Sequence, residues 1–264
     1  MPKQIEFNNP NDWSNFCSYI KKENRFVLGD YWKDFFNVLK HTAKKRKNVI
    51  KKKSVLCRAR IGFNEVLNEE TENGIPDLRM WAYRKHQIGA TPPAKSKNGR
   101  INPKGISYLY LSSDKTTAIK EVRPLIKETV SVGFFKANTD LKCIDTSDDK
   151  PIMYLPYDFS CDPPKYIDPT SETKEKKIWG DINASFSKPI YPQDEDIEYL
   201  PTQYLSEYFK VIGYDGIIYR SSLSKDGYNI VLFDPKAVDY ALSKAYDINA
   251  INYDLQERSD LFCK

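Results

Sequence analysis

Apolar and polar positions recur with two different periods along this chain, and the periods predict its helices and strands. Near the amino terminus, apolar side chains recur every three or four residues over 12–20 and again over 30–39, which predicts two amphipathic helices. Neither helix is long enough to form a core alone. We therefore expect residues 1–53 to be an N-terminal helical extension that packs on the domain that follows.

Short apolar or alternating runs predict the strands of a main domain. In the first of these runs Arg58 and Arg60 share one face, so two guanidinium groups stand side by side. Each arginine is either a functional cation or a charge that protects an edge strand from aggregation. The expected strands are 54–62, 106–112, 129–135, 141–145, 216–221 and 229–233.

Helices are expected between and after these strands, over 171–186 and 202–212, but without the strict alternation that marks a parallel sheet. The sequence therefore predicts an α+β fold whose main domain spans 54–235. Residues 63–100 are polar and are expected to form a long irregular loop. Residues 236–264 are expected to be a helical or irregular tail packed on the domain.

Residues 99–125 join a loop containing glycine and proline, a strand and a helix. The expected apolar stripe of this helix extends as far as Leu125. Glu121 lies beside the stripe, so it should point along the edge of the core. Such a carboxylate is either part of a functional site or a surface residue paired with Lys120 or Arg123.

The composition sets limits on the class of protein. With 40% hydrophobic and 13% aromatic residues the chain can bury a core, which argues against disorder. No apolar run approaches the length of a membrane span, and the first residues do not lead into a signal-peptide core. We expect a cytoplasmic protein without a membrane partner.

Cysteine and histidine usage argues against several kinds of site. The five cysteines are scattered, which fits reduced thiols and neither a disulfide framework nor a zinc site. Only two histidines are present, so a histidine-built metal centre or a Ser-His-Asp triad is not expected. We therefore expect no metal.

The net charge of +5 is unevenly distributed. Residues 1–60 hold fifteen Lys and Arg against five Asp and Glu, and ten of these cations lie between Lys40 and Arg60 without any acidic residue. This stretch is either a nucleic-acid-binding stripe or a solvated helix end and linker. The second interpretation is favoured, because no aromatic residue is interleaved with the charges.

Four features follow one another along the main domain: an arginine on a strand, a Gly-Arg-x-Asn loop with a later tyrosine, a glutamate on a helix, and a Tyr-Arg-Ser-Ser segment before an apolar strand. In this order and spacing the chain resembles the RES-domain family, over roughly 54–235. The residues concerned are Arg58, Gly99-Arg100-x-Asn102 with Tyr110, Glu121, and Tyr219-Arg220-Ser221-Ser222 before Asn229-Ile230-Val231-Leu232-Phe233.

The resemblance implies a core similar to ADP-ribosyltransferases of the diphtheria-toxin type and an enzyme that cuts the nicotinamide–ribose bond of NAD. Members of the family are commonly toxins of bacterial toxin–antitoxin pairs, so a cognate antitoxin is an implied partner; homo-oligomer formation is left open. NAD is the substrate, and no cofactor is expected. The implied catalytic positions are Arg58, Tyr110, Glu121 and Ser221.

Substrate-binding positions extend this set. Arg60 is a second candidate for the family's arginine and Ser222 for its serine, and many members have proline where this chain has Arg220. The expected substrate-binding residues are Arg58, Arg60, Arg100, Asn102, Tyr110, Ser221, Ser222 and Asn229.

The chemistry of these residue types agrees with the resemblance. Nicotinamide leaves a cationic ribosyl centre, which a carboxylate such as Glu121 can stabilise. A strand-borne guanidinium such as Arg58 can bind a pyrophosphate, and the ring of Tyr110 can face a pyridinium. Because the leaving group is neutral, neither a second carboxylate nor a metal is required.

Several functions stay open on the sequence alone. The leading one is an NAD glycohydrolase, or a phosphorylase that uses phosphate in place of water. An ADP-ribosyltransferase acting on a protein or nucleic acid would share the same donor site. A binding protein that holds nucleic acid through 40–60 is the third alternative.

Overall fold

The structure is a computed structural model that describes residues 5–68, 77–188 and 190–252. Its helices and strands mix along the chain, so the expected α+β class is confirmed. The helices are α1 Asp12–Lys22, α2 Asp30–Thr42, α3 Lys85–Ile88, α4 Lys115–Glu121, α5 Ser171–Ser187, α6 Glu195–Glu198 and α7 Leu200–Val211. The strands are β1 Lys47–Ile50, β2 Val55–Ile61, β3 Asn64–Asn68, β4 Asp77–Trp81, β5 Leu109–Ser112, β6 Thr129–Ala137, β7 Leu141–Asp145, β8 Tyr157–Asp158, β9 Lys165–Tyr166, β10 Gly216–Arg220, β11 Tyr228–Leu232 and β12 Val238–Asp247.

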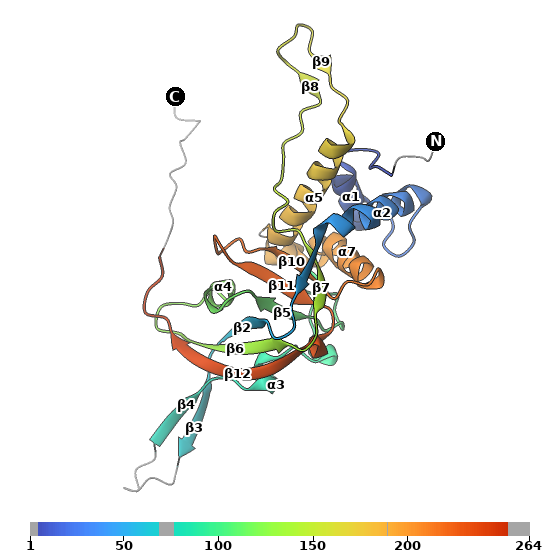
Figure 1. Cartoon of the computed structure of the whole chain (residues 1–264). Helices are drawn as coiled ribbons and strands as arrows, with labels where there is room; N and C mark the ends of the chain where they lie inside the picture. Colours follow the sequence, from blue (N-terminus) through green and yellow to red (C-terminus); the bar gives the residue numbers. More distant parts are fainter. Residues whose placement is uncertain (1–4, 69–76, 189, 253–264) are drawn as a thin grey trace, which may run out of the picture.

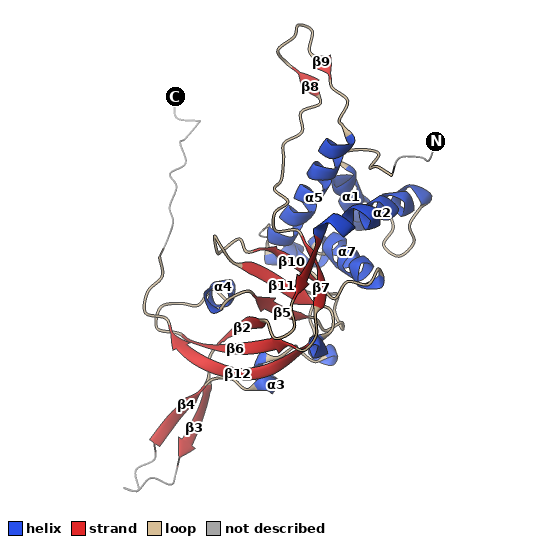
Figure 2. Cartoon of the chain, viewed as in Figure 1, coloured by secondary structure: helices blue, strands red, loops and turns tan. Residues whose placement is uncertain are grey.

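Within the described residues, eight strands form one mixed, strongly curved sheet in the order β1-β7-β10-β11-β5-β2-β6-β12 (Figure 2). The β7–β10 pair is parallel and the other neighbours are antiparallel. At the centre the ladder is almost interrupted, because β2 and β5 share a single residue pair, Cys57 with Ser112. The two halves of the sheet therefore diverge at this junction.

Three apolar clusters hold the architecture together. The largest lies between the helices α1, α2, α5 and α7 and one face of β7, β10 and β11 (Figure 1). A second cluster contains side chains from β2 and β6 together with side chains from β7, β10 and β11, so the curved sheet packs its two halves against each other. A third, smaller cluster joins α4 to β2 and β6.

The two N-terminal helices share their core with the rest of the chain. Phe16 and Phe36, both buried, belong to the same cluster as Trp179 of α5 and Phe209 of α7. Strand β1, which also falls within the expected extension, pairs with β7 in the main sheet. The division into 1–53, 54–235 and 236–264 stays a prediction, but no separate core divides the first helices from the domain in the described chain.

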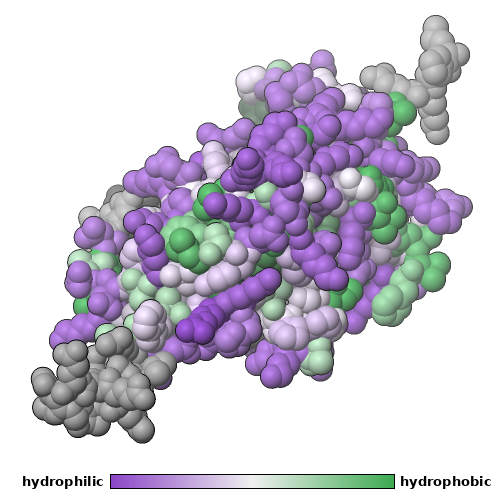
Figure 3. Space-filling model, turned by 60° about the horizontal axis from the view of Figure 1, so that its bottom comes forward, coloured by the Kyte–Doolittle hydropathy of each residue, from purple (hydrophilic) through white to green (hydrophobic). Residues whose placement is uncertain are grey.

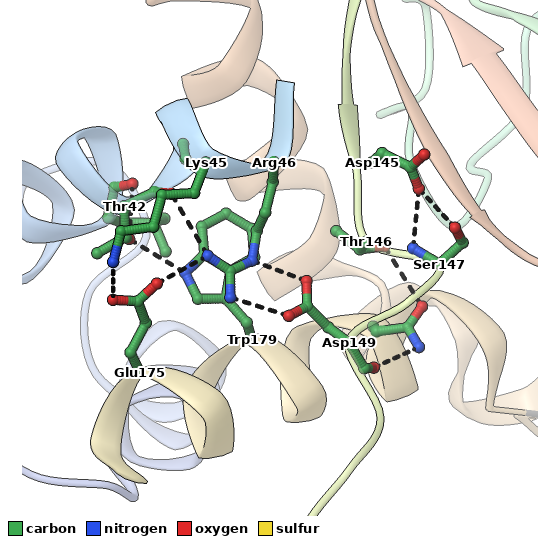
Figure 4. A network of polar contacts seen from close by, with 12 residues as sticks. Thr42, Lys45, Arg46, Asp145, Thr146, Ser147, Asp149, Glu175 and Trp179 are labelled. Atoms are coloured by element: carbon green, nitrogen blue, oxygen red, sulfur yellow. Dashed lines mark hydrogen bonds and ion pairs between the residues drawn. The ribbon is translucent and has the colours of Figure 1, made fainter. Parts of the chain in front are cut away.

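The basic stretch after α2 is tied to the body of the protein by an ion-pair network (Figure 4). Arg46 Nε and Nη2 donate to the carboxylate of Asp149 at 2.7 and 2.9 Å, and Arg46 Nη1 donates to Glu175 at 3.0 Å. The guanidinium also lies 4.2 Å from the ring centroid of Trp179. Lys45 donates to the other oxygen of Glu175 at 2.8 Å. These two cations therefore serve a packing role.

Residues 63–100 contain more regular structure than their polarity predicts. Instead of an irregular loop, they hold the β3–β4 hairpin, in which Asn64 pairs with Trp81, and the short helix α3. Part of the intervening segment, 69–76, lies outside the described residues. Among the described strands, the hairpin forms a small sheet of its own, separate from the main sheet. Its sequence therefore lacks the alternating apolar pattern of a strand that packs on the core.

The expectation for the last thirty residues is also wrong in part. Residues 238–247 form β12, the longest strand described, which pairs along β6 and closes one edge of the sheet. Of its side chains only Val238 is buried, so the strand lacks the apolar pattern by which strands are recognised. Its position is set by backbone pairing. Residues 253–264 lie outside the described part.

The surface is mainly hydrophilic. On the face seen in Figure 3, apolar side chains gather in small patches separated by hydrophilic ones. The β8–β9 hairpin extends away from the body beyond α5 (Figure 1) and carries exposed apolar side chains, among them Met153 and Phe159. No helix in the described ranges is long and apolar enough to cross a membrane.

Candidate active site

A pocket opens where β2 and β5 diverge. Its volume is about 180 Å³, and it is bounded by the two diverging strands, by α4, and by the ends of β10 and β11. Because a regular ladder would fill this space with paired backbone, the single residue pair between β2 and β5 is what creates the opening. The lining residues are Cys57, Arg58, Ala59, Tyr110, Leu111, Ser112, Ala118, Glu121, Val122, Tyr219 and Asn229.

Helix α4 brings Glu121 to this pocket and then stops. The side chain of Asp114 caps the helix by accepting from Thr117 N at 2.9 Å. Glu121 is the last helical residue, because Pro124 lies just beyond and the backbone at Arg123 is left-handed, with φ of 49°. The expected apolar stripe therefore ends early, and Leu125 is 68% exposed instead of buried.

Two side chains distant in sequence, one from the loop after β10 and one from β11, hold the Glu121 carboxylate. Ser221 Oγ donates to Glu121 Oε1 at 2.6 Å, and Asn229 Nδ2 donates to the same oxygen at 2.8 Å. Ser221 Oγ in turn accepts from Leu223 N at 3.1 Å. Neither Lys120 nor Arg123 makes a described ion pair with this carboxylate, so the functional interpretation of Glu121 is favoured over the surface-pair alternative.

The loop after Ser221 is fastened to the helix that carries Glu121. Ser221 N donates to Gly227 O at 3.1 Å, which closes the loop, and Thr117 Oγ1 donates to Ser224 Oγ at 3.2 Å. Gly227 lies so close to Thr117 that a Cβ atom has no space there. The serine and the glutamate are thus held by the same loop-to-helix contact.

Arg58 reaches the pocket as a half-buried cation without a carboxylate partner among the described residues. Its Nη1 donates to the carbonyl oxygen of Tyr110 at 3.1 Å, whereas its Nε is buried and makes no hydrogen bond within the described chain. Burial, together with the nearby charge of Arg60, lowers the pKa of Arg58 to about 10. A half-buried guanidinium with an unused donor is suited to bind an anion.

Tyr110 presents its ring to the pocket while its hydroxyl is used elsewhere. The hydroxyl donates to Asn102 Oδ1 at 2.7 Å and accepts from Ile101 N at 3.2 Å. Burial raises the pKa of Tyr110 well above its ordinary value. Tyr110 is therefore a neutral aromatic wall that anchors the 99–102 loop.

Asn102 is occupied by that loop. Its side-chain amide donates to Lys97 O at 3.0 Å and Ile106 O at 3.0 Å, and its carbonyl oxygen accepts from Tyr110. These contacts stabilise the loop. Substrate contact by Asn102 stays a prediction, and the structure gives the residue a scaffold role in the described chain.

Five expected residues lie outside the pocket lining: Asn102 and Ser221, described above, and Arg60, Arg100 and Ser222. Arg60 donates to Thr91 Oγ1 at 3.5 Å, and Arg100 Nη1 donates to Ser185 O at 3.0 Å. Ser222 is exposed in the loop after β10. Their roles in substrate binding stay predictions.

Tyr219 is a pocket residue that was not selected from the sequence. It belongs to the Tyr-Arg-Ser-Ser segment of the family pattern, but the sequence by itself indicates no role for it. It is 8% exposed, lines the pocket beside Tyr110, and packs on Phe186 with ring centroids 5.7 Å apart. Burial raises the pKa of Tyr219 far above its usual range, so its hydroxyl stays protonated. Two aromatic side chains, not one, therefore line the pocket.

The site combines a carboxylate, a half-buried cation and aromatic surface in one small space. No group of three or more His, Cys, Asp or Glu side chains within the described residues is arranged to hold a metal ion. Cys57, which also lines the pocket, is a poor nucleophile because burial raises the pKa of its thiol to about 11. The arrangement is suited to a ligand with separate anionic and cationic parts.

Comparison with known proteins identifies the domain. The family model described as "RES domain" matches residues 79–253, which include Tyr110, Glu121 and Ser221 but not Arg58. No curated protein sequence matches the chain. Among solved structures, the M. tuberculosis MbcT–MbcA toxin–antitoxin complex matches with a TM-score of 0.39 and 10% identity, over 79% of this chain and 92% of that chain. This structural likeness is too low to carry an argument, whereas the family model covers well over half of the chain. The chain belongs to the RES domain family.

Proposed function

We propose that this protein consumes NAD by cleaving its nicotinamide–ribose bond, with water or phosphate as acceptor. The observation that supports this best is the convergence on one aromatic-lined pocket of the Glu121 carboxylate and the Arg58 guanidinium, which has no carboxylate partner among the described residues. Membership of the RES domain family supports the same proposal. The resemblance described from the sequence implies an enzyme that acts on NAD.

The charges of Glu121 and Arg58 are complementary to two parts of NAD, the ribose that becomes cationic and the anionic pyrophosphate. Positive charge develops on the ribose as nicotinamide leaves, and a fixed carboxylate such as Glu121 stabilises it more in the transition state than in the ground state. The pyrophosphate is anionic and suits a guanidinium with free N–H groups, as Arg58 has. Tyr110 and Tyr219 offer aromatic faces for the pyridinium ring.

The size of the pocket limits what it can enclose. Pockets that bury a whole drug-sized ligand usually measure about 300–1,000 Å³, and this one measures about 180 Å³. We infer that it encloses the nicotinamide riboside part of NAD, and that the adenosine part lies along the surface outside. Glu121 is exposed in the unliganded protein, so the substrate itself has to exclude water from the carboxylate.

The direct test is to incubate the purified protein with NAD, with and without phosphate, and to identify the products by mass spectrometry. Free nicotinamide with ADP-ribose indicates hydrolysis, and nicotinamide with a phosphorylated ADP-ribose indicates phosphorolysis. Attachment of ADP-ribose to a protein or nucleic acid instead would favour the transferase alternative. Intact NAD under all conditions would end the proposal.

Glu121→Gln gives the sharpest variant for this test. The amide keeps the size of the side chain and its capacity to accept from Ser221, so we expect the melting temperature to change little. Loss of the charge should lower kcat by about a hundredfold, the effect of removing about 3 kcal/mol of transition-state stabilisation. A folded variant with unchanged kcat would show that this carboxylate does not stabilise the ribosyl cation.

A further inference from the structure

Both hydrogen bonds that hold Glu121 fall on one of its two carboxylate oxygens. Ser221 Oγ and Asn229 Nδ2 donate to Oε1 at 2.6 and 2.8 Å, and no donor among the described residues reaches Oε2. The carboxylate is therefore fixed by one oxygen while the other is left for a ligand. The helix adds no further restraint, because Glu121 is its last residue.

The orientation of the Asn229 amide is itself fixed by a residue of the neighbouring strand. Ser112 Oγ donates to Asn229 Oδ1 at 3.2 Å, and the two residues are direct partners in the β5–β11 ladder. Ser112 is 4% exposed and Asn229 is 7% exposed, so water does not offer an easy substitute for this bond. With its oxygen bound by Ser112, the amide can only turn its NH₂ group toward Glu121.

The opposite orientation of the amide is unfavourable. It would place Oδ1 of Asn229 against Oε1 of Glu121, so two acceptors would face each other without a proton between them. The Ser112 hydroxyl could accept from the NH₂ group in that orientation, so the penalty lies at the Glu121 contact. The observed orientation satisfies both contacts at once, with Ser112 donating to Oδ1 and the NH₂ group donating to Glu121.

We propose that Ser112 and Asn229 form a positioning pair, which holds Glu121 by Oε1 and presents Oε2 to the substrate. The proposal rests on the function proposed above, and it gives Asn229 a role different from the substrate contact expected from the sequence. Strand-borne groups suit this task, because β5 and β11 are paired interior strands of the main sheet whereas Ser221 lies in the loop between β10 and β11.

Asn229→Leu tests the role of the amide. Leucine has a similar volume and no hydrogen-bonding group, so the side chain of Glu121 loses its strand-borne donor. We expect kcat to fall by about 10- to 100-fold, because misplacement of a reacting group by about 1 Å costs a factor of this size. KM for NAD should stay within about threefold. A raised KM with unchanged kcat would instead make Asn229 a substrate contact and overturn the proposal.

Ser112→Ala tests whether the serine acts through the amide. We expect a loss of kcat of several-fold in the wild-type background and no further loss in the Asn229→Leu background. Additive losses would show that Ser112 acts independently, against the proposal. Ser113→Ala is the control, since Ser113 Oγ accepts from Tyr228 N at 3.1 Å and donates to Asp114 Oδ2 at 3.0 Å, and no contact of Ser113 with Glu121 is found in the described chain.

A second variant covers the case in which Asn229→Leu does not fold. Asn229→Asp preserves the shape of the side chain and puts a second carboxylate beside Glu121. Two carboxylates at hydrogen-bond distance share a proton, so we expect the acidic limb of the pH–kcat profile to move to higher pH. A lower kcat with an unmoved acidic limb would contradict the proposed contact.

Crystal structures of the variants separate this proposal from the proposed function. If the wild-type protein does not turn over NAD, the enzyme proposal fails, but the positioning pair still predicts a displaced Glu121 side chain in Asn229→Leu. It also predicts an unmoved side chain in Ser113→Ala. A Glu121 side chain that keeps its position in Asn229→Leu would overturn the positioning pair whatever the activity.

Discussion

Replacement of Arg58 by methionine should make the protein more stable and less able to bind NAD. The side chain of Arg58 is a half-buried cation with one described hydrogen bond, from Nη1 to Tyr110 O, and with a buried, unpaired Nε. Its ion-pair partner under the proposed function is the ligand. In the free protein the charge is therefore an uncompensated cost, and methionine fills much of the same volume without it.

The magnitude follows from these contacts. Replacement of buried charged groups by apolar residues of similar volume often gains about 1–4 kcal/mol, and loss of the bond to Tyr110 costs about 1 kcal/mol. The net gain of up to about 3 kcal/mol should raise Tm by up to about 10 °C in a domain of this size. Hydrogen bonds to a charged group contribute about 1.5–3 kcal/mol, so KM for NAD should rise by about 10- to 150-fold.

Thermal unfolding and steady-state kinetics measured on the same preparation test both effects. Arg60→Met is the matched control, because Arg60 lies on the same strand face but outside the pocket lining. We expect it to change KM by a few-fold at most. A destabilised Arg58→Met protein with unchanged KM would refute the interpretation of Arg58 as an anion site kept without a partner.

Two further predictions concern the scaffold. Burial raises the pKa of Glu175, but hydrogen bonds from Lys45 and Arg46 outweigh it and leave the pKa below its ordinary value of 4.5. The network therefore adds stability at neutral pH that is lost as the pH falls below about 4.5. In denaturant unfolding, Glu175→Gln should be less stable than wild type at pH 7, and the difference in unfolding free energy should shrink at pH 3. A difference that does not depend on pH would contradict this. In Gly99→Ala the new Cβ would collide with Asn102 Oδ1 and lie 2.8 Å from the Tyr110 hydroxyl, so we expect a loss of about 1–3 kcal/mol and lower activity. Gly29→Ala, which meets no atom within 4 Å, should leave Tm nearly unchanged, and equal effects of the two variants would exclude steric strain as the cause.

The sequence alone determined the elements that carry a strong hydrophobic period. Helices α1, α2, α5 and α7 and strands β2, β6, β7, β10 and β11 lie where their patterns predict, because each buries one or both faces in a shared core. It also identified residues that meet in the pocket, since their order along the chain matches a family pattern. The helices and strands follow from local periodicity, and the site residues follow from the order of particular residue types along the chain.

Tertiary structure alone decided the rest. Strand β12 is fixed by backbone pairing with β6. Most of its side chains are exposed, so its sequence has no apolar pattern that predicts a strand. The pocket exists because β2 and β5 share one residue pair, a feature of sheet curvature and not of either strand's sequence. The contacts of Glu121 with Ser221 and Asn229 span 100 and 108 residues. No local periodicity encodes such contacts. They form because the folded sheet brings the ends of β10 and β11 next to the end of α4.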